Sequence, residues 1–218
     1  MKIESFKILV SETIGSVSGE TVLPENISAL LVLAHGAGAD MNHKFMKSLA
    51  KGLADVGIGT LRFNFPFMEN KKGRPDPPAV AEKTIEAVIL KAKEMFPTTR
   101  LLAGGKSFGG RMTSNLLAKK QLPVESLIFY GFPLHAPGKA STERAAHLRD
   151  VKVPMLFLQG SKDTLAKLEL ITDVTSNLSL ATLVVFEGAD HSFAVGKKDV
   201  LPELINHSHQ WISKTAAK

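Results

Sequence analysis

Two kinds of apolar pattern alternate along the chain. Short runs in which nearly every residue is apolar are separated by longer stretches in which apolar and polar residues recur with helical spacing. A short, fully apolar run predicts a strand covered on both faces, and its alternation with helices is typical of βαβ units in a parallel sheet. The predicted strands are residues 29–35, 59–65, 100–105, 126–132, 154–160 and 181–188.

The segments between these strands predict helices and one loop. Residues 66–77 are rich in proline, glycine and charge, which favours a loop, and residues 3–23 predict one or two antiparallel edge strands. No repeat or linker interrupts the chain, so we expect residues 1–218 to form one α/β domain, with a mostly parallel twisted sheet between helices. The predicted helices are residues 42–56, 78–96, 108–119, 142–148, 165–175 and 201–214.

Composition excludes several classes of protein. No apolar run approaches the roughly 20 residues of a membrane span, and the first residues lack the apolar core of a secretory signal, so we expect a cytoplasmic protein that does not bind membranes. The absence of cysteine excludes disulfides and a cysteine nucleophile. The net charge is +6, but the lysines are scattered and aromatic residues make up only 6%, which favours a solvated basic surface over nucleic-acid binding.

The most informative segment is LLAGGKSFGGRMTSNLL, in which a predicted strand runs into Gly105-Lys106-Ser107-Phe108-Gly109 and then directly into a helix. This G-x-S-x-G pattern recurs by chance in many chains, but between a strand and a helix it predicts a tight turn that presents a serine nucleophile. Glycines beside the serine allow the strand and the helix to approach each other. A phosphate-binding loop is excluded, because the four-residue gap before Gly-Lys-Ser is missing.

A serine hydroxyl becomes a good nucleophile only when a histidine removes its proton and an acid orients that histidine. Asp163 follows the strand at 154–160, and His191 follows the strand at 181–188, so both emerge at the same sheet edge as Ser107. Asp190 is the alternative acid, but a residue adjacent to His191 cannot easily hydrogen-bond Nδ1 of its ring while the imidazole faces Ser107. The other six histidines lie in predicted helices or loops, or precede the acid in the chain.

The segment His35-Gly36-Ala37-Gly38 follows an early strand, and its small residues allow a backbone N–H to turn toward the reaction centre. We assign the oxyanion hole to the backbone N–H groups of Ala37 and Phe108, with Gly38 as the alternative to Ala37. His35 is expected to shape this loop through hydrogen bonds.

With the oxyanion loop, Ser107, Asp163 and His191 in this order along the chain, the sequence resembles the α/β-hydrolase superfamily from about Leu30 onward. The motifs LRFNFPFME, GGKSFGGRM, FYGFPLH, LFLQGSKDTL and FEGADHSF look like those of a small lidless group related to dienelactone hydrolases. That group is similar to the hydrolase-like domain of a nonspecific-lethal complex subunit and of a testis-expressed protein. The resemblance implies an α/β-hydrolase fold without a cap domain.

The predicted function is a serine hydrolase that cleaves an ester or related acyl bond through an acyl-enzyme, without a metal or other cofactor. Carboxylesterase-like activity is the class expected, and thioesterases and peptidases use the same three side chains. The alternative is a catalytically inert α/β-hydrolase-like domain that binds other proteins.

Only about twenty residues separate FYGF from PMLF, which leaves room for a short helix but not for an inserted cap. An open site of this kind suits small acyl substrates. Arg62, Asn64, Lys106 and Arg74 are predicted near the sheet edge as candidate ligands for an anionic substrate, although arginine and lysine stems commonly just cover a protein surface.

Overall fold

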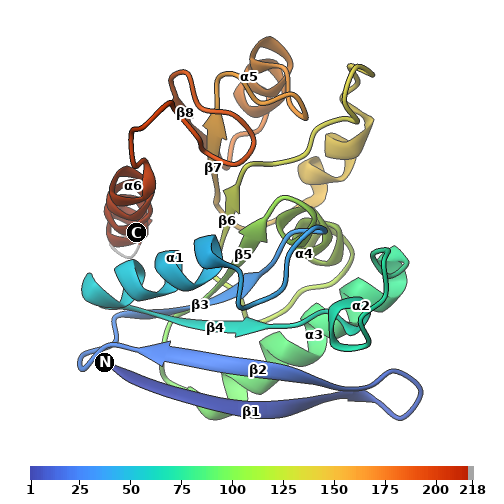
Figure 1. The fold of residues 1–218 in the computed structure, drawn as a ribbon, viewed down its shortest axis with the longest axis vertical. Coiled ribbons are helices and arrows are strands. Elements are labelled where there is room, and N and C mark those ends of the chain that lie inside the picture. The colour runs from blue at the N-terminus through green and yellow to red at the C-terminus, as the bar shows by residue number, and fades with distance from the viewer. Residues whose placement is uncertain (216–218) are drawn as a thin grey trace.

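One eight-stranded sheet forms the centre of the protein. The computed structural model describes residues 1–215, and the sheet has the spatial order β1-β2-β4-β3-β5-β6-β7-β8 (Figure 1). The strands are β1 (Lys2–Ser11), β2 (Gly15–Leu23), β3 (Ala29–Ala34), β4 (Ile58–Phe63), β5 (Leu101–Lys106), β6 (Ser126–Tyr130), β7 (Met155–Gly160) and β8 (Ala181–Phe186). All six predicted strands are confirmed within two residues at each end.

The strand directions bring many carboxyl ends to one edge of the sheet. Every neighbouring pair from β4 through β8 in the spatial order is parallel, whereas β1 pairs with β2 and β2 with β4 in the antiparallel sense. This confirms the predicted edge strands in residues 3–23. The loops that follow β3, β5, β6, β7 and β8 therefore meet at a common edge, as expected for a parallel sheet.

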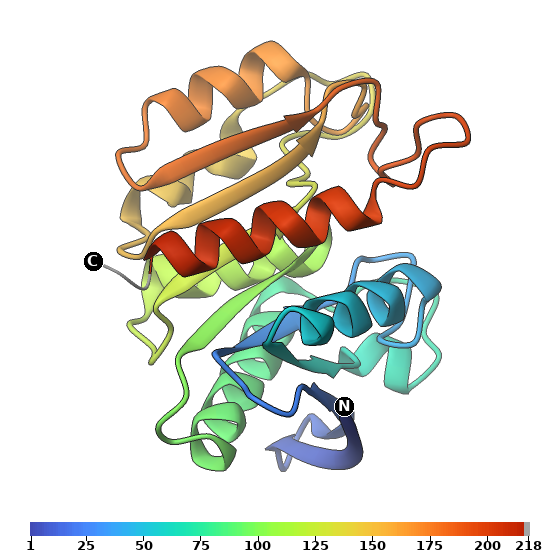
Figure 2. The ribbon, with the colours of Figure 1, turned by 90° about the vertical axis from the view of Figure 1, so that its left-hand side faces the viewer.

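Helices cover both faces of the sheet and enclose two apolar cores. Helices α1 and α6 pack on one face, and α3, α4, η1 and α5 pack on the other. Figure 2 shows the red helix α6 crossing the face turned toward the viewer. The bounds are α1 (Lys44–Asp55), α2 (Pro66–Glu69), α3 (Pro78–Met95), α4 (Phe108–Lys119), η1 (Glu143–Asp150), α5 (Leu168–Ser176) and α6 (Leu201–Thr215).

The structure departs from the sequence prediction at three elements. A four-residue helix, α2, lies inside the predicted loop at 66–77, and it begins with Pro66, a residue well suited to a first helical turn. The predicted helix at 142–148 is a 3-10 helix. Strand β8 is only partly buried, with Val185 40% exposed, because it is an edge strand that pairs with β7 alone.

Only η1 lies between β6 and β7, so no cap domain covers the edge of the sheet within residues 1–215. None of the helices formed by these residues has the length and apolar composition of a membrane span.

Candidate active site

Ser107 lies on a strained turn between β5 and α4. Its backbone has φ of 50° and ψ of −115°, a conformation that residues with a side chain rarely adopt. A Cβ atom added at Gly109 would lie 2.6 Å from the carbonyl oxygens of both Ala34 and His35. A Cβ at Gly105 would lie 2.4 Å from the oxygen of Ala34. The glycines thus allow β5 and α4 to pack against the end of β3. A Cβ atom at Gly110 would also lie 2.8 Å from the carbonyl oxygen of Gly105, so β5 and α4 approach each other as predicted.

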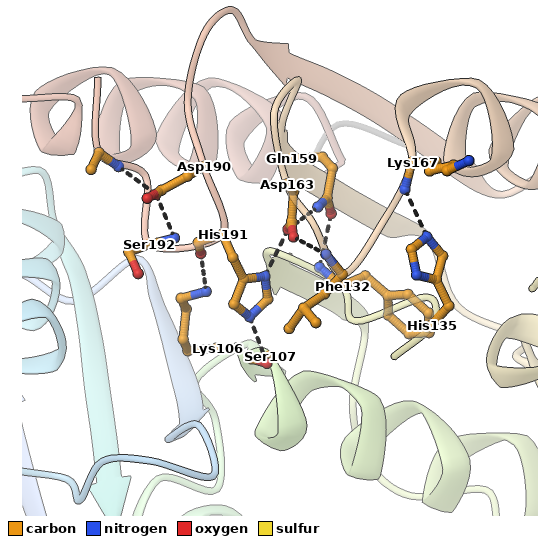
Figure 3. Close-up of polar contacts among 12 residues, drawn as sticks. Lys106, Ser107, Phe132, His135, Gln159, Asp163, Lys167, Asp190, His191 and Ser192 are labelled. Carbon is orange, nitrogen blue, oxygen red and sulfur yellow. Dashed lines mark hydrogen bonds and ion pairs between the residues drawn. The ribbon is translucent and has the colours of Figure 1, made fainter. Parts of the chain in front are cut away.

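Three side chains from separate loops form one line of hydrogen bonds (Figure 3). The Nε2 atom of His191 lies 2.8 Å from Oγ of Ser107, and its Nδ1 atom lies 2.7 Å from Oδ2 of Asp163. The imidazole is 22% exposed, whereas the Asp163 side chain is fully buried. The structure therefore brings together the three residues that the sequence singled out, in hydrogen-bonding contact.

The Asp163 carboxylate is held by two further donors. Its Oδ2 accepts a hydrogen bond of 2.5 Å from Nε2 of Gln159, and its Oδ1 accepts one of 2.7 Å from the backbone N–H of Leu165. Gln159 is fully buried, and its Oε1 accepts a hydrogen bond from the N–H of Phe132. The sequence prediction missed Gln159. Its signal was a lone amide side chain in the otherwise apolar strand MLFLQG.

The Asp190 carboxylate hydrogen-bonds the backbone of its own loop. Its Oδ1 accepts hydrogen bonds from the N–H groups of Ser192, at 2.8 Å, and Ala194, at 2.9 Å. Such bonds close a turn around an aspartate. Asp190 thereby shapes the loop that presents His191, and of the two carboxylates considered, Asp163 is the one bonded to the imidazole.

His135 holds the loop that carries the acid. Its ring Nδ1–H donates to the carbonyl of Ala136 at 2.9 Å, and its Nε2 accepts from the N–H of Lys167 at 3.0 Å. The ring is nearly fully buried. Because Lys167 caps α5, this histidine fixes the end of the loop that runs from Asp163 into that helix.

His35 holds the start of the loop that contains Ala37 through both of its ring nitrogens. Ring Nδ1–H of His35 donates to the carbonyl of Gly36, and ring Nε2 accepts from the N–H of Phe65. Complete burial lowers the pKa of His35 to about 4, partly opposed by the hydrogen bond to Gly36 and the charge of Asp40. The expected role of His35 in shaping this loop is supported by these contacts.

Arg62 and Asn64 hold the far end of the same loop, at Met41. Arg62 donates to the Met41 carbonyl and forms an ion pair with Glu20, the residue directly opposite it in the pairing of β2 with β4. Asn64 accepts from the N–H of Met41 at 3.0 Å and donates to Glu69 at 3.1 Å. Arg62 and Asn64 thus bond to groups within the protein, and neither lines the cavity beside Ser107.

Of the four predicted substrate contacts, only Lys106 reaches the cavity beside Ser107. Arg74 is exposed in the segment before α3 and does not line that cavity. The position of a surface loop relative to Ser107 depends on tertiary packing, which the sequence pattern does not reveal.

The cavity beside Ser107 and His191 has a volume of about 370 Å³. Its walls include Phe45, Met46 and Leu165, together with Ala37 of the predicted oxyanion loop. Phe108 is the first residue of α4, where the backbone N–H groups have no partner within the helix and the helix dipole favours negative charge. A larger cavity, of about 620 Å³, lies between η1 and α5, away from these groups.

A second serine-histidine contact has a structural explanation. Oγ of Ser114 lies 2.7 Å from Nε2 of His147 and donates to the carbonyl of Arg111. Ser114 has a single hydroxyl proton, which it donates to the Arg111 carbonyl. The hydrogen bond between His147 and Ser114 is therefore donated by the histidine, so His147 does not accept the Ser114 proton as a general base would. Ser114 is also completely buried within α4. Burial, with the charges of Arg111 and Lys119, lowers the pKa of His147 to about 4, while Asp150 opposes the shift.

Within residues 1–215, no cluster of three or more histidine and acidic side chains has the arrangement of a metal site.

The fold and the line of hydrogen bonds define an α/β-hydrolase architecture, with a serine at the turn after β5. The chain belongs to the alpha/beta hydrolase family, because the family model described as an alpha/beta hydrolase domain matches residues 27–216.

Solved structures extend the likeness over nearly the whole chain. An alpha-beta serine hydrolase homologue from Coxiella burnetii is 25% identical, with a TM-score of 0.77 over 96% of this chain and 97% of that chain. A serine hydrolase without a lid from Xanthomonas campestris is 22% identical, with a TM-score of 0.78 over 98% and 95%. A dienelactone hydrolase from Anabaena variabilis is 18% identical, with a TM-score of 0.79 over 98% and 97%.

These neighbours confirm the predicted resemblance to a small lidless group of α/β-hydrolases. The relation to the nonspecific-lethal complex subunit and the testis-expressed protein stays a prediction.

Proposed function

We propose that the protein is a serine hydrolase in which Ser107 is the nucleophile, His191 is the general base and Asp163 orients the histidine. The observation that carries this proposal is the continuous line of hydrogen bonds from Asp163 through His191 to Ser107, with contacts of 2.7 Å and 2.8 Å. These contacts are within the range that proton transfer requires. All eight strands belong to one sheet, which supports a single domain for this activity.

The first half-reaction forms an acyl-enzyme. Oγ of Ser107 attacks the acyl carbonyl carbon, and its proton passes to Nε2 of His191. The negative charge moves to the carbonyl oxygen, where the N–H groups of Ala37 and Phe108 bind it. The bond to the leaving group then breaks, and His191 returns the proton to the departing alcohol.

The second half-reaction regenerates the serine. Water attacks the acyl carbon while His191 takes one of its protons, and the bond from the carbon to Oγ breaks. The proton returns to Ser107 and the carboxylic acid leaves. Asp163 stabilises the protonated imidazole in both halves, because its carboxylate is fixed by Gln159 and Leu165 and faces Nδ1.

The cavity indicates the class of substrate. A volume of about 370 Å³ lies near the lower end of the range for small-molecule sites, and its apolar wall of Phe45, Met46 and Leu165 suits a short acyl group. We propose carboxylesterase-like activity on small esters with short acyl chains.

The direct test combines labelling with a fluorophosphonate probe and a screen of p-nitrophenyl acetate, butyrate and octanoate. We expect the probe to label Ser107 and the short esters to be cleaved fastest. Ser107→Ala should abolish labelling and lower kcat on the order of 10⁴-fold. Ser114→Ala is the matched control, since it removes the other serine bonded to a histidine, and it should retain labelling. An unlabelled wild-type protein would instead support the inert, protein-binding alternative.

A further inference from the structure

The Lys106 side chain links two loops of the candidate active site. Lys106 is the last residue of β5 and directly precedes Ser107. Its Nζ donates a hydrogen bond of 2.5 Å to the backbone carbonyl of His191 (Figure 3). It also lies 5.4 Å from the centroid of the Phe193 ring. The side chain thus connects the end of β5 to the loop after β8.

Gly131, which follows β6, leaves the space that this contact needs. A Cβ atom at Gly131 would lie 3.0 Å from Nζ of Lys106 and 3.5 Å from Cε1 and Nδ1 of His191. The glycine has φ of 75°, a conformation that other residues rarely adopt. The ammonium group and the imidazole therefore lie side by side over the same glycine.

We propose that Lys106 is a positioning residue that holds the backbone of His191 at a fixed place relative to Ser107. The inference rests on the proposed function. Asp163 orients the imidazole ring, whereas Lys106 fixes the chain from which the ring projects.

This contact matters most in the acyl-enzyme. Acylation removes the hydroxyl proton of Ser107, so that Oγ no longer donates to Nε2 of His191. The hydrogen bond between Lys106 and the His191 carbonyl does not depend on that proton. It therefore keeps the imidazole within reach of the attacking water during the second half-reaction.

The strength of the contact depends on the charge of the lysine. Burial lowers the pKa of Lys106 to about 8, and the charges of Asp163 and Asp190 oppose this shift. The loops after β3 and β6 face the side chain with Gly36 and Gly131, while His191 faces it from the loop after β8. An ammonium donates a stronger hydrogen bond than a neutral amine, so the contact weakens as the pH rises above about 8.

The experiment compares Lys106→Met with Lys198→Met on neutral p-nitrophenyl acetate and on an anionic ester of equal size. Lys198 lies in the same segment after β8 but pairs with Glu203, so its replacement should leave kcat unchanged. Lys106→Met should lower kcat about tenfold on both esters without raising KM. The wild-type kcat should fall above pH 8, and Lys106→Met should lack this fall.

An unchanged kcat in Lys106→Met would overturn the inference. So would a rise in KM confined to the anionic ester, since that result would make Lys106 a substrate ligand. If Lys106→Met does not fold, the wild-type profile decides, because a flat kcat to pH 9.5 also overturns the inference. Fluorophosphonate labelling of the wild type separates these results from failure of the proposed function, which would abolish labelling itself.

Discussion

The ring of His35 accepts a hydrogen bond of 3.0 Å from the backbone N–H of Phe65. Its other nitrogen donates to the carbonyl of Gly36 at 2.8 Å. This arrangement requires the neutral ring, because a proton on Nε2 would point at the N–H of Phe65. The start of the loop that carries Ala37 is therefore tied to the chain after β4 only while His35 is uncharged.

The first prediction concerns acid stability. The pKa of His35 is about 4 in the folded protein and near 6.5 in an exposed chain, so below pH 6.5 the unfolded chain takes up a proton that the folded chain does not. The contribution of neutral His35 to the free energy of unfolding is therefore fully present above pH 6.5. It is lost as the pH falls through about 4, which lowers the free energy of unfolding by up to about 3 kcal/mol. Urea unfolding at pH 7 and pH 4.5 measures this loss.

The control for this prediction is His35→Gln, which keeps a donor and an acceptor but does not titrate. Its free energy of unfolding should change less between pH 7 and pH 4.5 than that of the wild type, even if it is lower at pH 7. Equal pH dependence in the two proteins would contradict the assignment. His147, whose pKa is also lowered to about 4, should add to the residual dependence in the same direction.

The second prediction distinguishes Asp163 from Asp190, the two carboxylates considered as the partner of His191. Asp163→Asn removes the acceptor for Nδ1 of His191, so kcat should fall by about 10³ to 10⁴-fold. Asp190→Asn keeps an oxygen acceptor for the N–H groups of Ser192 and Ala194, so kcat should stay within a few fold of the wild-type value. Steady-state kinetics on p-nitrophenyl acetate gives both values, and a larger fall in Asp190→Asn would reverse the assignment.

Sequence alone predicted the three contacting residues because of a rule of topology. Short apolar strands alternating with helices predict a parallel sheet, and the carboxyl ends of parallel strands share one edge. Ser107 directly follows β5, Asp163 lies three residues after β7, and His191 lies five residues after β8. Their convergence follows from strand direction, without knowledge of any side-chain packing.

The partners of Arg62 and Asn64 were beyond prediction for a physical reason. Glu20 meets Arg62 only because β2 joins the sheet antiparallel to β4 in one particular register. A shift of one residue would turn the glutamate to the other face. Most residues of β2, GSVSGETVL, are polar or glycine, so its sequence specifies its register weakly. Helix α2 is too short to show a helical period.

The third prediction tests the turn that presents Ser107. In Gly109→Ala the new methyl group would lie 2.6 Å from two backbone oxygens, those of Ala34 and His35, which cannot move independently of β3. We expect a loss of about 3 kcal/mol in the free energy of unfolding, together with a loss of activity. Gly73→Ala is the matched control, because nothing lies within 4 Å of its added Cβ. Urea unfolding of the two variants should differ clearly, and equal stability would contradict the close packing.

The fourth prediction concerns the arginines first considered as anion ligands. Arg62→Met removes the donor to the Met41 carbonyl and the partner of the mostly buried Glu20, so the free energy of unfolding should fall by roughly 2 to 4 kcal/mol. Any loss of kcat/KM arises through the loop that contains Ala37 and should therefore be equal for neutral and anionic esters.

Arg74→Ala is the comparison, because this exposed residue lies away from the cavity and should leave both the stability and the ester preference unchanged. The ratio of kcat/KM for an anionic ester to that for a neutral ester of equal size is the deciding measurement. A ligand for the substrate charge would lower this ratio when removed, whereas a residue that supports the loop lowers both values together. A selective loss in Arg62→Met would show that its guanidinium reaches the substrate despite its contacts with Glu20 and Met41.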